Sequence, residues 1–586
     1  MNVWMKKITA CVMAAAMLLM AVPTIAVPTM VTSAEETAGD FTYQVNGSLG
    51  RAIITGYTGN ATEVVVPAEL GGYPVTSISD DVFENNTQIV RVVLPDGVTS
   101  FDSLFYGCTS LQSVELPDSL QSIGSYAFYN CTKLSDIELP NTLRFIENMA
   151  FYNCAALTSL VIPEGVTNIG DRAFASCEGL QSVSLPKSLT WIYSTAFSGC
   201  SAITELHIAD LTAWCRVGFI GNTIPFSTPH DLYIAGERVE DLVIPEGITR
   251  INDYAFAYAN IRSLTAPDSV IAIGGGAFYG CELLTDIDLP DTILEIKSCS
   301  AFLETGYYND PNNWTDQALY LDGYLLQIQS GISGDYTVRE ATTLIAGYAF
   351  SSGGKITGIS LPDSVVAVGE YAFDGTAYYR NSENWTNDCL YIDHCLIQVK
   401  KTYTGSYTPP AGITVVADGA FRECTGLSGV TLPAKAQVIG HNTFGGCTSL
   451  SSIHIPAGVR YVHETAFANC SSLNTITLSA ENPVFSIIGE CLVYTPTRTL
   501  VVGTNRGSIP DDGRVTAIGS YAFSGRLGLQ TLFIPTCVES VGYQALYGCT
   551  GLKDVYIGTA GVPAPWNVEW KEWWGTVHTG YTTDSR

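Results

Sequence analysis

One short pattern returns along almost the whole chain, and this repetition constrains the fold more than any other feature. Its clearest copy, at residues 116–131, reads Leu-Pro-x-Ser-Leu-x-x-Ile-Gly-x-x-Ala-Phe-x-x-Cys. Successive anchor residues, which are Phe in all copies but one, are 22 to 24 residues apart in most intervals. Such a period is typical of solenoids, whose repeats are too small to bury an apolar face alone. The anchors are Phe83, Phe105, Phe128, Phe151, Phe174, Phe197, Phe256, Phe278, Phe302, Phe350, Phe373, Phe421, Phe444, Phe467, Phe523 and Leu546.

The pattern inside each copy predicts a short strand followed by turns. In residues 111–116 apolar and polar side chains alternate, so Val114 points inward and Glu115 outward. Pro117 then ends the strand, because proline cannot donate to a ladder. A period near 23 lies in the range of leucine-rich repeats. The expected fold is therefore a β-rich solenoid of stacked units of about 23 residues, forming an elongated arc of roughly 80 Å at the usual strand spacing.

Four longer gaps between anchors indicate insertions. Two of them share a frame with Asn313-Trp314-Thr315 in one and Asn384-Trp385-Thr386 in the other, and both predict β-hairpins that stay in the stack. The ends of a solenoid need covers, because its terminal strands are open edges. We predict a signal peptide at 1–34, an N-terminal β cap at 35–80, the solenoid at 81–558 with insertions near 201–245, 303–349, 374–420 and 478–515, and a Trp-rich C-terminal cap at 559–586.

The N-terminus predicts secretion. Lys6 and Lys7 precede an apolar run at residues 8–22, and Thr32-Ser33-Ala34 offers a small-residue cleavage site. A membrane span needs about 20 apolar residues, and no second long apolar stretch follows. We therefore expect an extracellular protein without a transmembrane span. Its net charge of −28 also argues against nucleic acid as a partner.

Ten cysteines occupy the same place in the repeat, three residues after the anchor. In a secreted protein this could indicate disulfides. We favour a ladder of buried thiols that pack as small apolar groups, because other copies place different residues there. The spacing also differs from that of zinc sites. The ten are Cys108, Cys131, Cys154, Cys177, Cys200, Cys281, Cys424, Cys447, Cys470 and Cys549.

No catalytic or cofactor-binding motif stands out. The seven histidines include no His-Glu-x-x-His pair, and neither a nucleophile elbow nor a phosphate-binding loop is evident. Single acidic pairs mean little among 56 acidic residues. We expect no enzyme activity, no metal and no cofactor.

The outward positions of the predicted strands are the one surface with a systematic origin. Acidic residues dominate its first half, and small hydroxylated residues with a few aromatics its second half. We expect this ladder to form the concave face, which repeat proteins often use for binding. Exposed aromatics such as Trp566 and Trp570 could either stack on sugars or cap the last repeat. The candidate ligand-binding residues are Glu115, Asp136, Glu138, Glu205, Asp241, Asp286, Asp288, His454, Phe533 and Tyr556.

The repeated run at 116–131, and its variant at 139–154, resembles the BspA-like leucine-rich-repeat family of bacterial surface and secreted proteins. The resemblance implies a non-enzymatic protein that mediates adhesion. We therefore predict a secreted or cell-surface-associated monomer that recognises an extracellular protein or glycan through its concave face and insertions. The alternative is a carbohydrate-binding accessory protein that uses the Trp and Tyr clusters.

Overall fold

The chain winds into a β-solenoid whose turns each contribute two short strands. The computed structural model describes residues 35–221, 223–562 and 575–581; the predicted signal peptide and the tryptophans at 566–574 lie outside these ranges. In most turns a longer strand comes first and a strand of two or three residues follows it, so the stack carries two parallel ladders. The predicted solenoid of stacked units is confirmed.

The longer strands form one ladder, which we call the outer ladder because it lies along the outer margin of the solenoid. They are β4 (Glu63–Val65), β7 (Arg91–Val93), β9 (Ser113–Glu115), β11 (Asp136–Ile137), β13 (Ser159–Val161), β15 (Ser182–Leu185), β17 (Glu205–Ile208), β19 (Asp231–Ile234), β21 (Asp241–Val243), β23 (Ser263–Thr265), β25 (Asp286–Asp288), β30 (Ser333–Thr337), β32 (Lys355–Ser360), β37 (Thr404–Tyr407), β39 (Gly426–Val430), β41 (Ser452–Ile455), β43 (Thr475–Leu478), β48 (Thr531–Ile534), β50 (Asp554–Ile557) and β51 (Thr576–Thr579).

The short strands form the inner ladder. They are β8 (Ser100–Phe101), β10 (Ser122–Ile123), β12 (Phe145–Ile146), β14 (Asn168–Ile169), β16 (Trp191–Tyr193), β18 (Gly218–Ile220), β22 (Arg250–Ile251), β24 (Ala272–Ile273), β26 (Glu295–Ile296), β31 (Leu344–Ile345), β33 (Ala367–Val368), β38 (Val415–Val416), β40 (Val438–Ile439), β42 (Tyr461–Val462), β47 (Ala517–Ile518) and β49 (Ser540–Val541).

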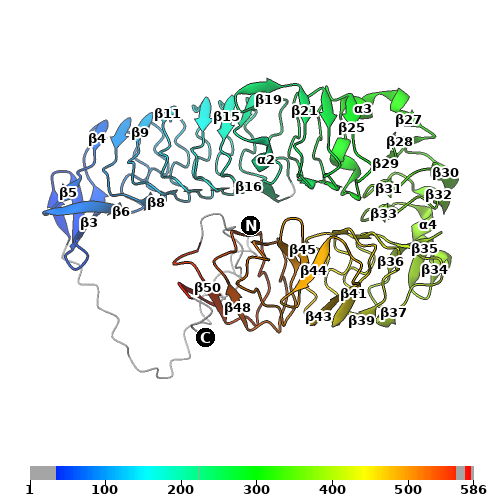
Figure 1. Cartoon of the computed structure of the whole chain (residues 1–586). Helices are drawn as coiled ribbons and strands as arrows, with labels where there is room; N and C mark the ends of the chain where they lie inside the picture. Colours follow the sequence, from blue (N-terminus) through cyan, green and yellow to red (C-terminus); the bar gives the residue numbers. More distant parts are fainter. Residues whose placement is uncertain (1–34, 222, 563–574, 582–586) are drawn as a thin grey trace, which may run out of the picture.

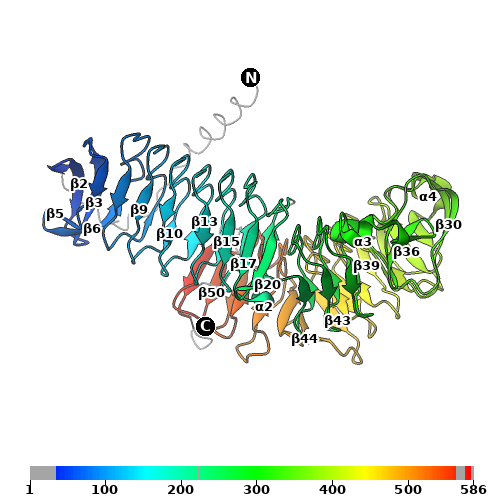
Figure 2. The ribbon, with the colours of Figure 1, turned by 90° about the horizontal axis from the view of Figure 1, so that it is seen from above.

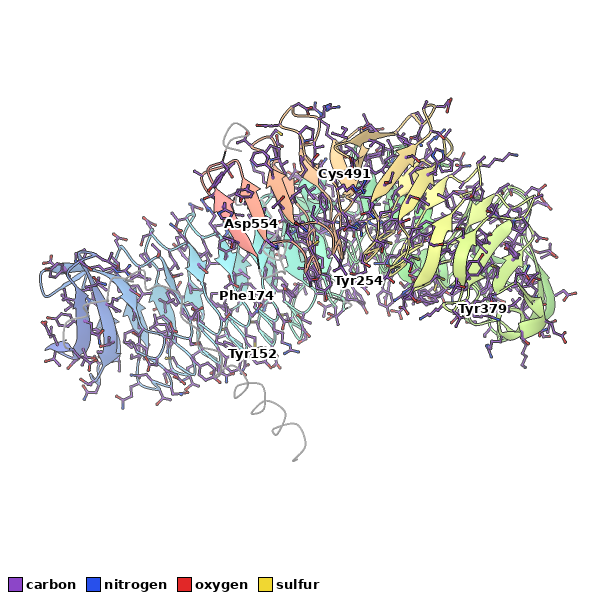
Figure 3. All side chains as sticks on the ribbon, turned by 90° about the horizontal axis from the view of Figure 1, so that it is seen from below. Tyr152, Phe174, Tyr254, Tyr379, Cys491 and Asp554 are labelled. Atoms are coloured by element: carbon purple, nitrogen blue, oxygen red, sulfur yellow. The ribbon has the colours of Figure 1, made fainter. Side chains whose placement is uncertain are left out.

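The anchor phenylalanines stack in a row through the core, as the period predicts. Phe128 and Phe151 lie nearly parallel with ring centroids 4.9 Å apart, and Phe174 continues the row at 5.1 Å. Figure 3 shows Phe174 inside the coil. Where the insertion after Phe197 interrupts the repeat, Phe226 continues the stack at 4.9 Å. The apolar spine therefore continues past an irregularity in the sequence.

The cysteine positions hold buried thiols that satisfy backbone carbonyls. The Cys154 sulfhydryl, for example, donates to the Phe128 carbonyl of the preceding turn at 3.2 Å, and all ten thiols are buried and unpaired. Burial raises the pKa of the Cys108 thiol to about 12, so this thiol remains protonated and apolar in character. Arg526 takes the cysteine place in one copy, and its guanidinium donates to the Phe467 carbonyl at 3.0 Å.

Where a glycine follows a short strand, as at Gly170 and Gly274, close approach of the neighbouring turn requires it. A Cβ at Gly170 would lie 2.6 Å from the Glu147 carbonyl carbon, and one at Gly274 would lie 2.4 Å from the Asp253 nitrogen. Such distances are shorter than any normal van der Waals contact. Glycine at this place therefore sets the turn spacing on the inner side.

The solenoid doubles back on itself instead of forming one open arc. In Figure 1 the first arm runs from β4 to β26, a bend follows from β27 (Trp314–Thr315) to β38, and the returning arm runs from β39 to β51. Figure 2 shows that the N-terminal turns of the first arm project beyond the end of the returning arm. Contacts between the arms come from the short strands: the Trp191 and Tyr543 rings are 5.4 Å apart.

The prediction that the longer strands form the concave face is therefore wrong. They lie along the outer margin of both arms, with β9, β15 and β25 on one side and β39 and β43 on the other, whereas the short strands face the space between the arms (Figure 1). The expectation of one elongated arc is also wrong, because the solenoid doubles back on itself.

The insertions explain the direction of the bend. Hydrogen bonds continue across them on the inner side, where the Gly347 amide donates to the Ile296 carbonyl at 3.1 Å and the Asp418 amide donates to the Val368 carbonyl at 2.9 Å. On the outer side β25 and β30 belong to different sheets, as do β32 and β37. The inserted residues therefore separate successive turns on the outer side. As a result the stack of turns curves toward the inner ladder.

The insertions in the bend are two copies of one motif, which ends in the predicted β-hairpin. The first comprises a 3-10 turn η1 (Cys299–Phe302), α3 (Gly306–Asn309), a turn η2 (Pro311–Asn313), β27, β28 (Ala318–Leu321) and β29 (Tyr324–Ile328). The second comprises α4 (Ala377–Arg380), a turn η3 (Ser382–Asn384), β34 (Trp385–Thr386), β35 (Cys389–Ile392) and β36 (Cys395–Val399). β29 pairs in parallel with β31, so the hairpin stays in the stack.

The remaining elements are the N-terminal sheet and the other two insertions. β1 (Glu36–Ala38), β2 (Phe41–Asn46), β3 (Arg51–Tyr57), β5 (Glu69–Leu70) and β6 (Tyr73–Ile78) form one sheet. Its Tyr57 ring meets the first anchor, Phe83, at 5.4 Å. The insertion near 201–245 supplies α2 (Leu211–Trp214) and β20 (Glu237–Val239); the one near 478–515 supplies β44 (Phe485–Ile488), β45 (Cys491–Tyr494) and β46 (Thr499–Val502).

Candidate functional site

The ten candidate residues lie on the outer ladder or at its edge, but they do not converge on one site. Six acidic residues, Glu115, Asp136, Glu138, Asp241, Asp286 and Asp288, are exposed on the first arm. Glu205 is half-buried there beside His207, with 3.3 Å between carboxylate and imidazole. His454, Phe533 and Tyr556 lie on the returning arm.

Three of the acidic residues share a shallow groove near the start of the first arm. Glu115, Asp136 and Glu138 line a volume of about 380 Å³, and Arg91 lines its other side. The Arg91 guanidinium pairs with Glu115 and lies 3.9 Å from Glu63. One arginine among these carboxylates leaves the groove acidic, so it favours a basic partner.

A second groove lies on the returning arm, at an interruption of the outer ladder. Within the described residues, no outer-ladder strand lies between β43 and β48, because the chain there forms the hairpin β44–β46 and then the loop 503–509. The resulting groove has a volume of about 690 Å³, which is the size of a typical ligand pocket. Phe533 and Tyr556 line it, so the structure brings two candidate residues together here.

The aromatic residues Phe533, Tyr556 and Tyr581 line one wall of this returning-arm groove. Phe533, Tyr556 and His578 are paired across the three parallel strands β48, β50 and β51. The Tyr556 and His578 rings stack at 4.6 Å, and Tyr581 meets Tyr556 edge-on at 5.0 Å. Asp554, labelled on β50 in Figure 3, holds the His578 imidazole at 2.8 Å. This wall is an apolar surface fixed by its neighbours.

The loop 503–509 forms the opposite wall and is held by Asn505. The Asn505 amide donates to the Ser471 carbonyl at 2.9 Å, and its oxygen accepts from the Gly528 amide at 2.9 Å. These bonds replace the missing strand and present Arg506, which is exposed at the rim. An apolar wall facing a basic, polar rim can anchor one large side chain and a neighbouring carboxylate or carbonyl.

Sequence reasoning missed two residues that line this groove, Tyr581 and Arg506, and also His578, which stacks on Tyr556. His578 and Tyr581 fall in the segment predicted only as a cap, although the alternation at residues 576–579 and its 22-residue distance from β50 repeat the strand pattern. Arg506 belongs to an irregular loop, for which the repeat gives no signal. The insertion tryptophans act as braces: the Trp314 indole donates to the Tyr308 carbonyl at 2.8 Å, and Trp385 does the same to Tyr379 at 2.9 Å.

A polar cluster on the inner ladder joins the two arms. The Arg250 guanidinium contacts the Glu295 carboxylate at 3.3 Å and donates to the Tyr461 hydroxyl of the returning arm at 2.8 Å. The Glu295 carboxylate also lies 3.7 Å from His463. Burial, followed by the charges of His441 and Arg250, holds the pKa of His463 well below its usual range, so this imidazole is neutral.

Two further carboxyl groups of the cluster lie at the bend. Burial, together with the neighbouring Glu295 and Glu370, holds the pKa of Asp418 well above its usual range, so this carboxyl carries a proton. Burial also pushes the pKa of Glu370 upward, but its hydrogen bonds with His441 and Arg422 outweigh burial and keep that pKa low. The cluster therefore occupies the inner face near the bend and leaves the outer face free for partners.

A family model for the BspA type leucine-rich repeat region matches residues 101–217, 232–308, 335–393, 400–513 and 503–561. The chain belongs to this family. No curated protein matches the chain.

Several solved structures share similarity with this BspA-type chain. A leucine-rich-repeat protein of T. pallidum is 36% identical over 29% of this chain and 81% of its own, with a TM-score of 0.28. A leucine-rich-repeat protein from Bacteroides ovatus is 20% identical over 89% of this chain and 94% of its own chain, with a TM-score of 0.31. A leucine-rich cell surface protein of Faecalibacterium prausnitzii is 20% identical over 90% of this chain and 95% of its own chain, with a TM-score of 0.26.

No helix within residues 35–221, 223–562 and 575–581 has the length and apolar character needed to cross a bilayer. In the same ranges no three His, Cys, Asp or Glu side chains are grouped as metal ligands.

Proposed function

We propose that this chain is a secreted or cell-surface-associated protein that binds another extracellular protein through the outer face of its solenoid. The observation that carries the proposal is the returning-arm groove, whose ordered aromatic wall and basic rim suit an anchor side chain of a partner. Interfaces draw most of their binding energy from a few such anchors. The repeat family and the lack of a catalytic motif favour binding over catalysis.

The first arm contributes in a different way. Its exposed carboxylates, including Asp136, Glu138, Asp286 and Asp288, would attract a basic surface over a distance near the Debye length of about 8 Å. Such charges raise association rates more than they raise affinity. The partner we propose therefore has a basic surface and one protruding apolar or aromatic side chain.

The test is binding of the chain lacking residues 1–34 to purified extracellular matrix proteins, measured by surface plasmon resonance. Tyr556→Ala should weaken binding at least about tenfold, because a truncated hot-spot residue typically costs more than 1.4 kcal/mol. Tyr126→Ala is the matched control, since Tyr126 is 39% exposed on the first arm. Asp136/Glu138/Asp286/Asp288→Ala should slow association and reduce its salt dependence. Equal binding by all variants would reject the outer face.

A further inference from the structure

A separate pocket lies on the inner ladder of the first arm, where the returning arm ends. Its volume is about 150 Å³, and Phe145, Trp191 and Tyr193 supply three aromatic walls. The Tyr543 ring of the returning arm lies against Trp191 at 5.4 Å, so the pocket opens beside the junction of the arms. None of the candidate residues on the outer ladder belongs to it.

The regular register of the ladder creates this pocket. Phe145, Asn168 and Trp191 are paired across β12, β14 and β16. Two residues further along the same three turns lie Glu147, Gly170 and Tyr193. Gly170 has no side chain, and the backbone of the previous turn would exclude one. The middle of the second row therefore carries no side chain, and Glu147 and Tyr193 stand on either side of it.

Two polar groups of the pocket lack partners. Asn168 is only 8% exposed; its side-chain oxygen accepts from the Thr190 hydroxyl at 3.1 Å, while its amide nitrogen has no partner among the described residues. The Glu147 carboxylate takes part in no hydrogen bond or ion pair within those residues, and burial, followed by the charge of Asp102, raises its pKa. Buried polar groups almost always have a partner, so an unpaired amide here points to a missing one.

We propose that this pocket binds one neutral pyranose ring, either as a free sugar or as the end of a glycan. A cavity of about 150 Å³ accommodates a six-membered ring. The C–H faces of a pyranose pack against aromatic rings, and its hydroxyls accept from the Asn168 amide and donate to Glu147. The inference goes beyond the protein binding proposed above, because it uses the opposite face and different residues.

The same groups disfavour other ligands of this size. A hydrocarbon ring would offer no acceptor to the Asn168 amide and no donor to the Glu147 carboxyl. An anion would meet the Glu147 carboxylate. A quaternary ammonium ion would suit three aromatic rings and a carboxylate, but it offers no acceptor to the unpaired amide. A hydroxylated ring provides both an acceptor for the Asn168 amide and a donor for the Glu147 carboxyl.

The test is saturation-transfer NMR on the chain lacking residues 1–34, with the methyl glycosides of glucose, galactose, mannose and N-acetylglucosamine as probes at millimolar concentration. At least one should bind the wild type. Asn168→Leu keeps the volume and removes the donor, so affinity should fall about tenfold or more while the fold is kept. Glu147→Gln, at a half-buried position, is the second variant and should also weaken binding.

Two controls separate this pocket from the outer groove and from a cation site. Tyr556→Ala should leave pyranoside binding unchanged, so loss of protein binding in that variant would not affect this inference. Choline is the competing probe. The proposal is overturned if no pyranoside binds, if Asn168→Leu and Glu147→Gln bind as tightly as the wild type, or if choline binds in place of every pyranoside.

Discussion

Replacing Arg250 with Met should destabilise the doubled-back solenoid by about 3 kcal/mol. Arg250 contacts Glu295 at 3.3 Å and Tyr461 at 2.8 Å, and the Glu295 side chain is only 1% exposed. Breaking a buried ion pair by removing one partner costs about 3–5 kcal/mol. The lower end applies here, because the Arg250 side chain is 23% exposed and remains partly screened.

The origin of this cost can be tested with a double-mutant cycle. The isolated Glu295 carboxylate causes the loss, so Arg250→Met/Glu295→Met should recover stability to within about 1 kcal/mol of the wild type. Arg262→Met is the matched control: Arg262 pairs with Glu240 at 2.8 Å but is 62% exposed, so its loss should cost less than about 1 kcal/mol.

The assay is equilibrium denaturation in guanidinium chloride followed by circular dichroism. A solenoid need not unfold in one step, so the free energy is taken from the first transition. A cost below about 1 kcal/mol for Arg250→Met, or no recovery in the double variant, would refute the reasoning that this cluster braces the arms.

Three further predictions follow from the packing of the turns. Gly274→Ala should destabilise the chain by about 1–3 kcal/mol, because the added Cβ would lie 2.4 Å from the backbone of the neighbouring turn. The control is Gly275→Ala, whose added Cβ has its nearest contact at 3.8 Å and should change stability by less than about 1 kcal/mol. Equal effects of the two variants in denaturation would reject the argument that glycine sets the turn spacing. The pKa of Asp418 is higher in the folded state than in the unfolded state, so the free energy of unfolding should fall as the pH rises above about 4. Asp418→Asn should therefore be more stable than the wild type at neutral pH. An unchanged pH dependence of stability in this variant would contradict the conclusion that the folded Asp418 carboxyl is protonated. In the folded chain lacking residues 1–34, a thiol reagent should modify at most Cys299 and Cys537, because the other cysteines of the described residues are buried. Rapid modification of more than these two, counted by mass spectrometry, would contradict the burial.

Much of the fold could be predicted from the sequence, because each repeat carries its own local rules. Alternation before the Pro, the Gly after the Ile and the Phe at a fixed distance define the strand, the turn and the core of every unit. The direction of curvature could not be predicted in this way. It depends on which side the insertions thicken and on contacts such as Arg250 with Tyr461, which are 211 residues apart.

The candidate site was predictable only where it follows the repeat. Phe533 and Tyr556 were found because they alternate with buried residues in their strands. Their groove exists because a strand is missing from the ladder, and Arg506 reaches it from a loop that Asn505 holds. A missing strand has no sequence signature of its own. The inner pocket escaped notice for a related reason, since its six residues are ordinary ladder positions that become a site only when three turns are stacked.

Small-angle X-ray scattering of the chain lacking residues 1–34 tests most directly whether the outer ladder is the face offered to partners. If the solenoid doubles back, the pair-distance distribution should be that of two rods lying side by side. The maximum dimension should be well below that of a straight stack. A straight stack of about 22 turns at a spacing of 4.8 Å would be about 105 Å long. A single rod of that length in solution would contradict the account, because the short strands would then be as open to partners as the long ones.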